Sequence, residues 1–103
     1  RIDMTKIVLF CAGGMSTSLL VNKMREAAAK QGKEYDINAY GYGSEEKHAP
    51  DADCILLGPQ IRFNLKQLQT KYPDKPIAAI DMRTYGTMNG EATLKQAREL
   101  MND

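Results

Sequence analysis

Cys11 stands at the head of a segment that combines glycine with hydroxyl side chains. Residues 11–18 read Cys-Ala-Gly-Gly-Met-Ser-Thr-Ser, and they follow an apolar run at 6–10. Glycines allow the backbone to curl so that successive N–H groups point inward, and a following helix adds the unpaired donors and partial positive charge of its first turn. Such a loop binds phosphate, and the same field favours the thiolate of Cys11. The segment therefore predicts a phosphoryl-accepting cysteine; the alternative is a core thiol beside an ordinary tight turn.

Spacing excludes the better-known phosphate loops. The nucleotide-binding loop G-x-x-x-x-G-K-[ST] needs a Gly-Lys pair that follows neither Gly13 nor Gly14, and the dinucleotide fingerprint G-x-G-x-x-G is absent. A cysteine phosphatase of the C-x5-R type needs arginine six residues after its nucleophile, where this chain has Thr17. That arginine clamps the transferring phosphoryl group and stabilises its charge. A loop with neutral donors suits a carrier of phosphocysteine better than a phosphatase.

The elements that position this loop belong to a chain with the size and composition of one globular domain. It has 103 residues, 43% of them hydrophobic and 26% charged, close to the average for soluble domains. Its net charge of +1 lacks the basic excess that holds nucleic acid or an anionic membrane. We expect residues 4–103 to form the domain, with Met4 as the natural start and residues 1–3 as a remnant added in front of it.

Targeting and metal-binding signals are missing from the sequence. No stretch approaches the roughly 20 apolar residues of a membrane span, and the N-terminus lacks the pattern of a signal peptide. Two cysteines and the single, distant His48 do not have the spacing of a zinc site. We therefore expect a cytoplasmic, monomeric protein without metal or cofactor.

Short apolar runs alternate with helical periodicities along the chain. Strands are predicted at 6–10, 35–40, 54–57 and 77–80, and a short exposed crossover at 44–48. The helical stripes are Leu20, Met24, Ala27 and Gln31 (closed by Gly32), then Ile61, Leu65, Leu68 and Tyr72, then Gly90, Leu94, Ala97 and Met101. This alternation predicts a single-domain α/β fold, a doubly wound, four-stranded parallel sheet with helices on both faces. Ligands of such sheets bind beyond the carboxyl ends of the strands, which here carry Cys11, residues 58–60 and Asp81.

The motifs at these strand ends resemble one bacterial family. Phe10-Cys-Ala-Gly-Gly-Met-Ser-Thr-Ser-Leu-Leu-Val21, Leu56-Leu-Gly-Pro-Gln-Ile61, Ile80-Asp81 and Tyr85-Gly86 resemble the enzyme IIB component of the lactose and cellobiose/chitobiose branch of the phosphoenolpyruvate-dependent sugar phosphotransferase system. The resemblance covers residues 5–101 and favours the cellobiose type. It implies that Cys11 takes a phosphoryl group from a phosphohistidine of enzyme IIA and passes it to a β-linked disaccharide on the membrane enzyme IIC, docking at the inner face of the membrane. The phosphate cradle then falls on Ala12, Gly13, Gly14, Met15, Ser16, Thr17 and Ser18.

A second ring around the loop is predicted from the other strand ends. Gln60 either donates to phosphate or caps a helix, and Asp81 is expected to anchor its loop, since a free carboxylate would repel a phosphocysteine. Tyr85 is placed in the same ring. An apolar docking ring formed by Phe63 with Met15, Tyr85 and Met88 is the alternative to scattered surface residues.

Two further reactive residues are assigned elsewhere. Cys54 opens an apolar strand and is expected to be a core residue, too far from Cys11 for a disulfide. His48 lies on the polar crossover, and we do not expect it to carry phosphate.

Two functions compete with the carrier reading. One is a low-molecular-weight cysteine phosphatase or arsenate-reductase-like enzyme, which shares the thiolate in an N–H loop but needs the missing arginine. The other is a regulatory module that binds phosphate or a phosphoprotein without covalent chemistry. Turnover of an aryl phosphate favours the first, and a missing phosphocysteine favours the second.

Overall fold

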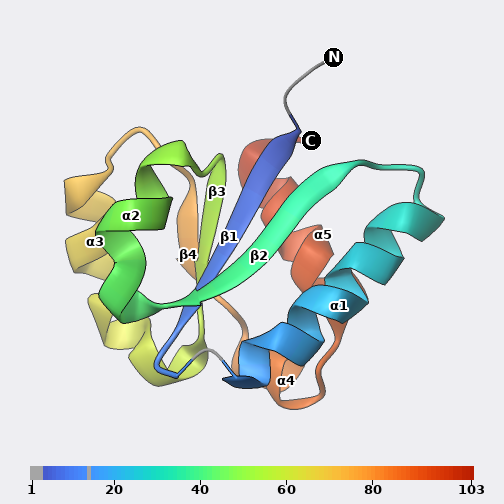
Figure 1. Ribbon diagram of the computed structural model, residues 1–103, viewed down its shortest axis with the longest axis horizontal. Helices are drawn as coiled ribbons and strands as arrows, with labels where there is room; N and C mark the ends of the chain where they lie inside the picture. The colour runs from blue at the N-terminus through green and yellow to red at the C-terminus, as the bar shows by residue number, and fades with distance from the viewer. Residues whose placement is uncertain (1–3, 14) are drawn as a thin grey trace.

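The computed structural model, which describes residues 4–13 and 15–103, has one sheet of four parallel strands in the order β2-β1-β3-β4 (Figure 1). Each strand lies within one residue of its predicted ends, and the predicted α/β fold is confirmed. Residues 1–3, read above as a remnant, lie outside the described part. The strands are β1 (Thr5–Cys11), β2 (Tyr35–Gly41), β3 (Cys54–Leu57) and β4 (Ile77–Ala79).

Helices cover both faces of the sheet, as the alternation predicts (Figure 1). One face carries α1 (Met15–Lys30), α4 (Met82–Gly86) and α5 (Gly90–Met101); the other carries α2 (Glu45–His48) and α3 (Leu65–Lys71) with the 3-10 turns η1 (Tyr42–Ser44), η2 (Ala49–Asp51) and η3 (Pro59–Asn64). The sequence analysis did not anticipate α4. The predicted helical stripe from Ile61 to Tyr72 spans η3 and α3, and the backbone at Ile61, inside η3, is not helical.

The central strand β1 is buried on both faces, and this divides the core in two. Ile7 and Leu9 pack into the cluster under α1 and α5, whereas Val8 and Phe10 pack into the cluster under η2 and α3. Alternate residues of a strand point to opposite faces, so a uniformly apolar run fits only a strand covered on both sides.

The end of α1 shows why Gly32 closes the first helix. Gly32 has a φ of +69°, and the bonds from Lys33 N to Ala28 O and from Gly32 N to Ala29 O form the Schellman arrangement that favours glycine at this position. Gln31 lies beyond the helix and is exposed, so its predicted place on the buried stripe is wrong.

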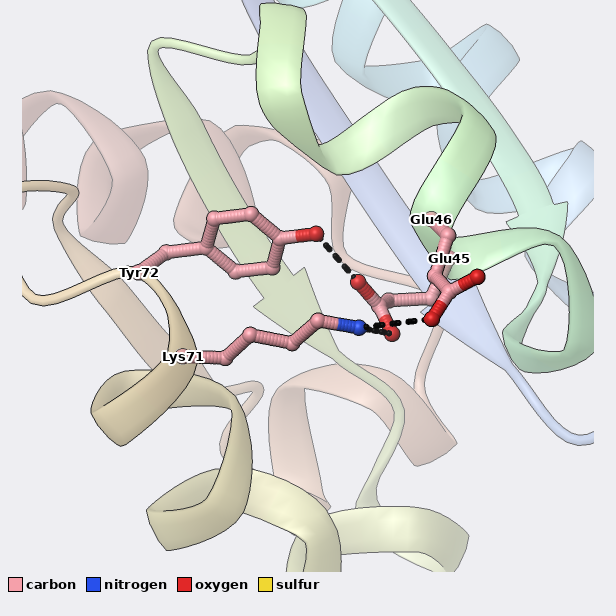
Figure 2. Close-up of polar contacts among 4 residues, drawn as sticks. All are labelled: Glu45, Glu46, Lys71 and Tyr72. Carbon is pink, nitrogen blue, oxygen red and sulfur yellow. Dashed lines mark hydrogen bonds and ion pairs between the residues drawn. The ribbon is translucent and has the colours of Figure 1, made fainter.

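The crossover after β2 is fastened to α3 by a polar cluster (Figure 2). Glu45 accepts hydrogen bonds from Lys71 Nζ at 3.1 Å and from Tyr72 Oη at 2.5 Å, and Lys71 also bonds Glu46 at 3.1 Å. Glu45 is buried, so the prediction of a wholly exposed crossover is wrong at this residue. The crossover has no apolar stripe to pack against the domain, and the hydrogen bonds of the buried Glu45 carboxylate to its two donors hold it there instead.

Tyrosine ionisation is expected to weaken the fold at alkaline pH. Burial, helped by a hydrogen bond to Asp103, raises the pKa of Tyr35 to about 12. The bond to Glu45 raises the pKa of Tyr72. Unfolded tyrosine has a pKa of about 10, so between about pH 10 and 12 the folded chain binds more protons than the unfolded chain. The stabilisation is therefore complete below about pH 10 and is lost as the pH rises toward 12.

Urea unfolding at stepwise pH across this range measures the effect. Tyr35→Phe should show a shallower loss of the free energy of unfolding than wild type, because phenylalanine has no proton to release. An identical slope in both proteins would contradict the expectation.

Candidate functional site

Cys11 is the last residue of β1 and lies opposite Gly41 of β2. From the central β1 the chain crosses first to β2 on one side, whereas β3 and β4 lie on the other side. The carboxyl ends of β1 and β3 therefore meet at the switch point of the sheet, where doubly wound folds bind ligands. The structure thus confirms the predicted location of Cys11 at a strand end.

The Cys11 thiol lies between α1 and β2. Its Sγ is 3.0 Å from Thr17 Oγ1 and 3.9 Å from the carbonyl oxygen of Tyr40. Cys11 is 2% exposed and Thr17 0%. Thr17 lies in the first turn of α1, so the helix directs its hydroxyl back toward the end of the strand that precedes it.

Two residues that follow Cys11 in the chain are open to solvent. Ala12 and Gly13 are exposed, and a Cβ added to Gly13 would meet no atom within 4 Å. The first turn of the 16-residue α1 has no acidic residue, so no carboxylate within that turn opposes the positive end of the helix dipole. An anion can approach this side. Ser18 is exposed on α1, and Gly14 and the side chains of Met15 and Ser16 lie outside the described part.

The loop after β3 reaches the same place. Gly58 N donates to Phe10 O at 2.8 Å, which ties the ends of β3 and β1 together. A Cβ on Gly58 would be 3.6 Å from Cys11 Cβ and 3.3 Å from Gln60 Oε1. Gln60 Oε1 therefore lies beside Gly58, the residue that borders Cys11.

The loop after β4 agrees with the predicted anchoring role of Asp81 and differs from the prediction at Tyr85. Asp81 caps α4, because its Oδ2 accepts from Thr84 N at 3.1 Å, and this backbone hydrogen bond lowers the pKa of the Asp81 carboxyl. Tyr85 is buried in the core under α1 and α5, since the unanticipated α4 turns it inward. Its edge still borders an apolar cavity of about 250 Å³, shared with Pro59, Gln60, Arg62, Met82 and Gly86.

Exposed apolar side chains surround this end of the sheet, but they are not the predicted set. Phe63 is 78% exposed, whereas Tyr85 is buried and Met88 packs against the core, so the predicted docking ring is wrong for these two; the Met15 side chain is not described. The sequence analysis missed Leu19 and Met82, which are both more than half exposed. Leu19 directly precedes Leu20 and therefore lies outside the buried stripe of α1. This position in the helical pattern could have predicted its exposure from the sequence.

Cys54 and His48 are not part of the loop that follows Cys11. Cys54 is fully buried opposite Ile7, four residues before Cys11 on β1, and both cysteines are free. Its place in the core cluster confirms the predicted core residue, and burial raises the pKa of the Cys54 thiol to about 12. His48 stacks on the Tyr40 ring at 3.5 Å between centroids and lines a cleft with Lys6 and Asp36 at the start of β1 and β2.

Residues 4–13 and 15–103 contain no cluster of acidic, histidine and cysteine side chains that could hold a metal ion. Within the same ranges, every helix is too short or too polar to cross a membrane.

Fold and site together define a class: a doubly wound α/β domain that holds a cysteine at the switch point of its sheet, followed by a segment without charged side chains. Residues 6–96 match the family model of the lactose/cellobiose-specific IIB subunit of the phosphotransferase system. The chain belongs to this family of sugar phosphotransferase IIB components.

Similar proteins agree in fold and differ in sugar. The galactose-specific IIB component of Lactococcus lactis subsp. cremoris is 42% identical, over 93% of this chain and 95% of that protein. The oligo-beta-mannoside-specific component of Bacillus subtilis is 43% identical, over 95% and 97%. The cellobiose-specific component of Lactococcus lactis subsp. lactis is 42% identical, over 93% and 95%. The solution structure of the cellobiose-specific component of Borrelia burgdorferi has a TM-score of 0.80 at 36% identity, over 99% and 95%.

A longer relative joins the domain to another component. The lactose-specific IICB component of Staphylococcus epidermidis is 28% identical over 98% of this chain, which corresponds to 18% of that protein.

Proposed function

We propose that Cys11 is the phosphoryl-carrying residue of this IIB component. The observation that carries the proposal is the position of Cys11 Sγ at the switch point, 3.0 Å from the hydroxyl of Thr17 in the first turn of α1. The positive end of α1 and the exposed backbone of Ala12 and Gly13 offer the phosphoryl oxygens neutral donors. The proposed phosphate cradle comprises Ala12, Gly13, Gly14, Met15, Ser16, Thr17 and Ser18, with Gln60 beside it.

The chemistry consists of two displacements at phosphorus. In the first, the Cys11 thiolate forms an S–P bond while the N–P bond of a phosphohistidine on enzyme IIA breaks, and the electron pair stays on the imidazole. In the second, a sugar hydroxyl forms the new O–P bond, its proton goes to a base of the sugar-binding component, and the electron pair of the S–P bond returns to sulfur. Both steps depend mainly on positioning, and neither requires a general base from this domain once Cys11 is a thiolate.

The partners follow from the family and from the gene fusion in its longer members. We infer that the acceptor is a sugar bound by enzyme IIC, because a relative carries IIC and IIB in one chain. The sugar class we propose is a β-linked disaccharide of the cellobiose type. The domain would then work at the inner face of the membrane, and the exposed Leu19, Phe63 and Met82 are suited to apolar contacts with its partners.

Mass spectrometry tests the proposal. The protein is incubated with phosphoenolpyruvate, enzyme I, the phosphocarrier protein HPr and a IIA protein of the lactose/cellobiose family, and is digested under conditions that preserve phosphocysteine. One added phosphate on Cys11 is expected. Its absence under these conditions would contradict the carrier role and favour a module that binds phosphate without covalent chemistry. Steady turnover of an aryl phosphate by the isolated protein would instead favour a phosphatase, even though the chain has Thr17 where a C-x5-R phosphatase has arginine.

A further inference from the structure

We propose that Thr17 is a positioning residue whose hydroxyl donates a hydrogen bond to the sulfur of Cys11 and stabilises it as a thiolate, both as attacking and as leaving group. The inference rests on the proposed carrier role of Cys11 and adds to it a function for the Thr17 side chain, as distinct from its backbone. Three properties of the contact support it: its geometry, its burial and its place in the loop.

Among the described residues, two partners of different kinds lie near Cys11 Sγ. The Tyr40 carbonyl, 3.9 Å from Sγ, can only accept a hydrogen bond, so it favours the protonated thiol. The Thr17 hydroxyl, 3.0 Å from Sγ, can accept from the thiol or donate to the thiolate. When Cys11 loses its proton to solvent, the hydroxyl can rotate to donate, and its own proton stays on Thr17. The same bond forms when the S–P bond breaks and the electron pair returns to sulfur.

Burial strengthens the hydrogen bond between Thr17 and Cys11. Both residues are almost fully shielded from solvent, so water competes little for the sulfur. A hydrogen bond to a charged group is stronger than one between neutral groups, and more so in a low dielectric. A fully buried hydroxyl destabilises the fold unless it forms a hydrogen bond. Valine has nearly the same shape as threonine but has no hydroxyl, so it could not form the hydrogen bond to Cys11.

The place of Thr17 explains the kind of catalysis it supports. It stands six residues after the cysteine, where a C-x5-R phosphatase has a guanidinium directed at the phosphoryl oxygens. A neutral hydroxyl directed at the sulfur stabilises the leaving thiolate without adding positive charge to the phosphoryl group. The thiophosphate is thus ready to be transferred to an acceptor, with less assistance to attack by water.

Alkylation by iodoacetamide, followed across pH, tests the hydrogen bond without any phosphotransfer partner. Burial raises the pKa of the Cys54 thiol to about 12, and peptide mapping of the alkylated protein assigns each adduct to Cys11 or Cys54. In Thr17→Val, which removes the hydroxyl and keeps the volume, we expect Cys11 to react at least about tenfold more slowly at neutral pH. The midpoint of the pH profile should move upward. Thr17→Ser should restore most of the rate, and Thr93→Val, at another fully buried threonine, should leave rate and midpoint unchanged.

Phosphoryl transfer from IIA, measured on the same variants, should fall in Thr17→Val and recover in Thr17→Ser. The inference is overturned if Thr17→Val alkylates with the rate and midpoint of wild type, or if Thr17→Ser is as impaired as Thr17→Val. In either case, phosphorylation of Cys11 in the wild-type protein would still support the carrier role. If wild-type Cys11 were not phosphorylated, the carrier role would be rejected, but the alkylation result for Thr17 would still stand.

If Thr17→Val does not fold, the wild-type protein still decides the question. The hydroxyl proton of Thr17 is shielded from solvent, so its NMR signal is expected to exchange slowly and to move downfield as Cys11 loses its proton. A signal that does not respond to this titration would overturn the inference.

Discussion

Cys11→Ser is expected to accept no phosphoryl group from phosphorylated IIA, while it keeps the fold. A serine hydroxyl remains protonated at neutral pH and is a far weaker nucleophile than a thiolate without an adjacent base. The described surroundings of Sγ offer the hydroxyl of Thr17 and the carbonyl of Tyr40, and neither is a general base of the strength required. Transfer of ³²P from labelled phosphoenolpyruvate, followed on native gels, measures the loss.

Cys54→Ser is the matched control for this experiment. It removes the other thiol of the chain at a fully buried position, so we expect it to destabilise the domain by about 1–3 kcal/mol through a buried hydroxyl. Its labelling should persist at temperatures where it remains folded. If Cys11→Ser still carried label in a bond with the hydrolysis pattern of a phosphocysteine, the assignment of the carrier residue would be wrong.

Gly90→Ala is expected to destabilise the domain by about 3 kcal/mol, the upper end for overpacking of a core. Gly90 begins α5 and lies against the backbone of α1, where an added Cβ would be 2.4 Å from the carbonyl carbon of Lys23 and 2.6 Å from Met24 N. Backbone atoms cannot rotate away as side chains can, so the two helices must separate. Because they share the larger core cluster, separation weakens packing along both.

The sign of the change in the free energy of unfolding distinguishes the effect of this contact from the effect of helix propensity. Alanine is intrinsically the better helix residue by about 1 kcal/mol, so a propensity effect would stabilise. Gly43→Ala, at an exposed position where the new Cβ would meet nothing within 4 Å, should change stability little. Urea unfolding of both variants measures the difference, and a Gly90→Ala protein as stable as Gly43→Ala would show that α1 and α5 move apart at no cost.

The two cysteines show how much of the structure around a residue can be predicted from the local sequence pattern. Cys11 stands between an apolar run and a glycine loop, whereas Cys54 opens an apolar run, and this difference alone predicts a strand-end thiol and a core thiol. Burial and register confirm both positions. The prediction succeeds because strand boundaries are marked locally, by apolar residues on one side and by glycine on the other.

The loops beyond the strands were less predictable. The inward turn of Tyr85 depends on α4, whose five residues include no apolar period long enough to reveal a helix, and on the cap from Asp81 to Thr84. The burial of Glu45 depends on Lys71 and Tyr72, which lie about 26 residues further along the chain. Charged side chains are assigned to the surface by any local rule, and only a distant partner makes their burial favourable.

The sequence by itself determined the four strands, the main helical stripes, the parallel α/β class and the strand end that carries Cys11, because periodicity and glycine placement report burial and turns within a few residues. Only the tertiary structure decided the strand order, the hydrogen bond that joins Gly58 to the end of β1, and the 3.0 Å approach of the Thr17 hydroxyl to the sulfur. These depend on how α1 leaves β1 and on which strands become neighbours. Such relations are fixed by packing across the whole sheet, and no local pattern encodes them.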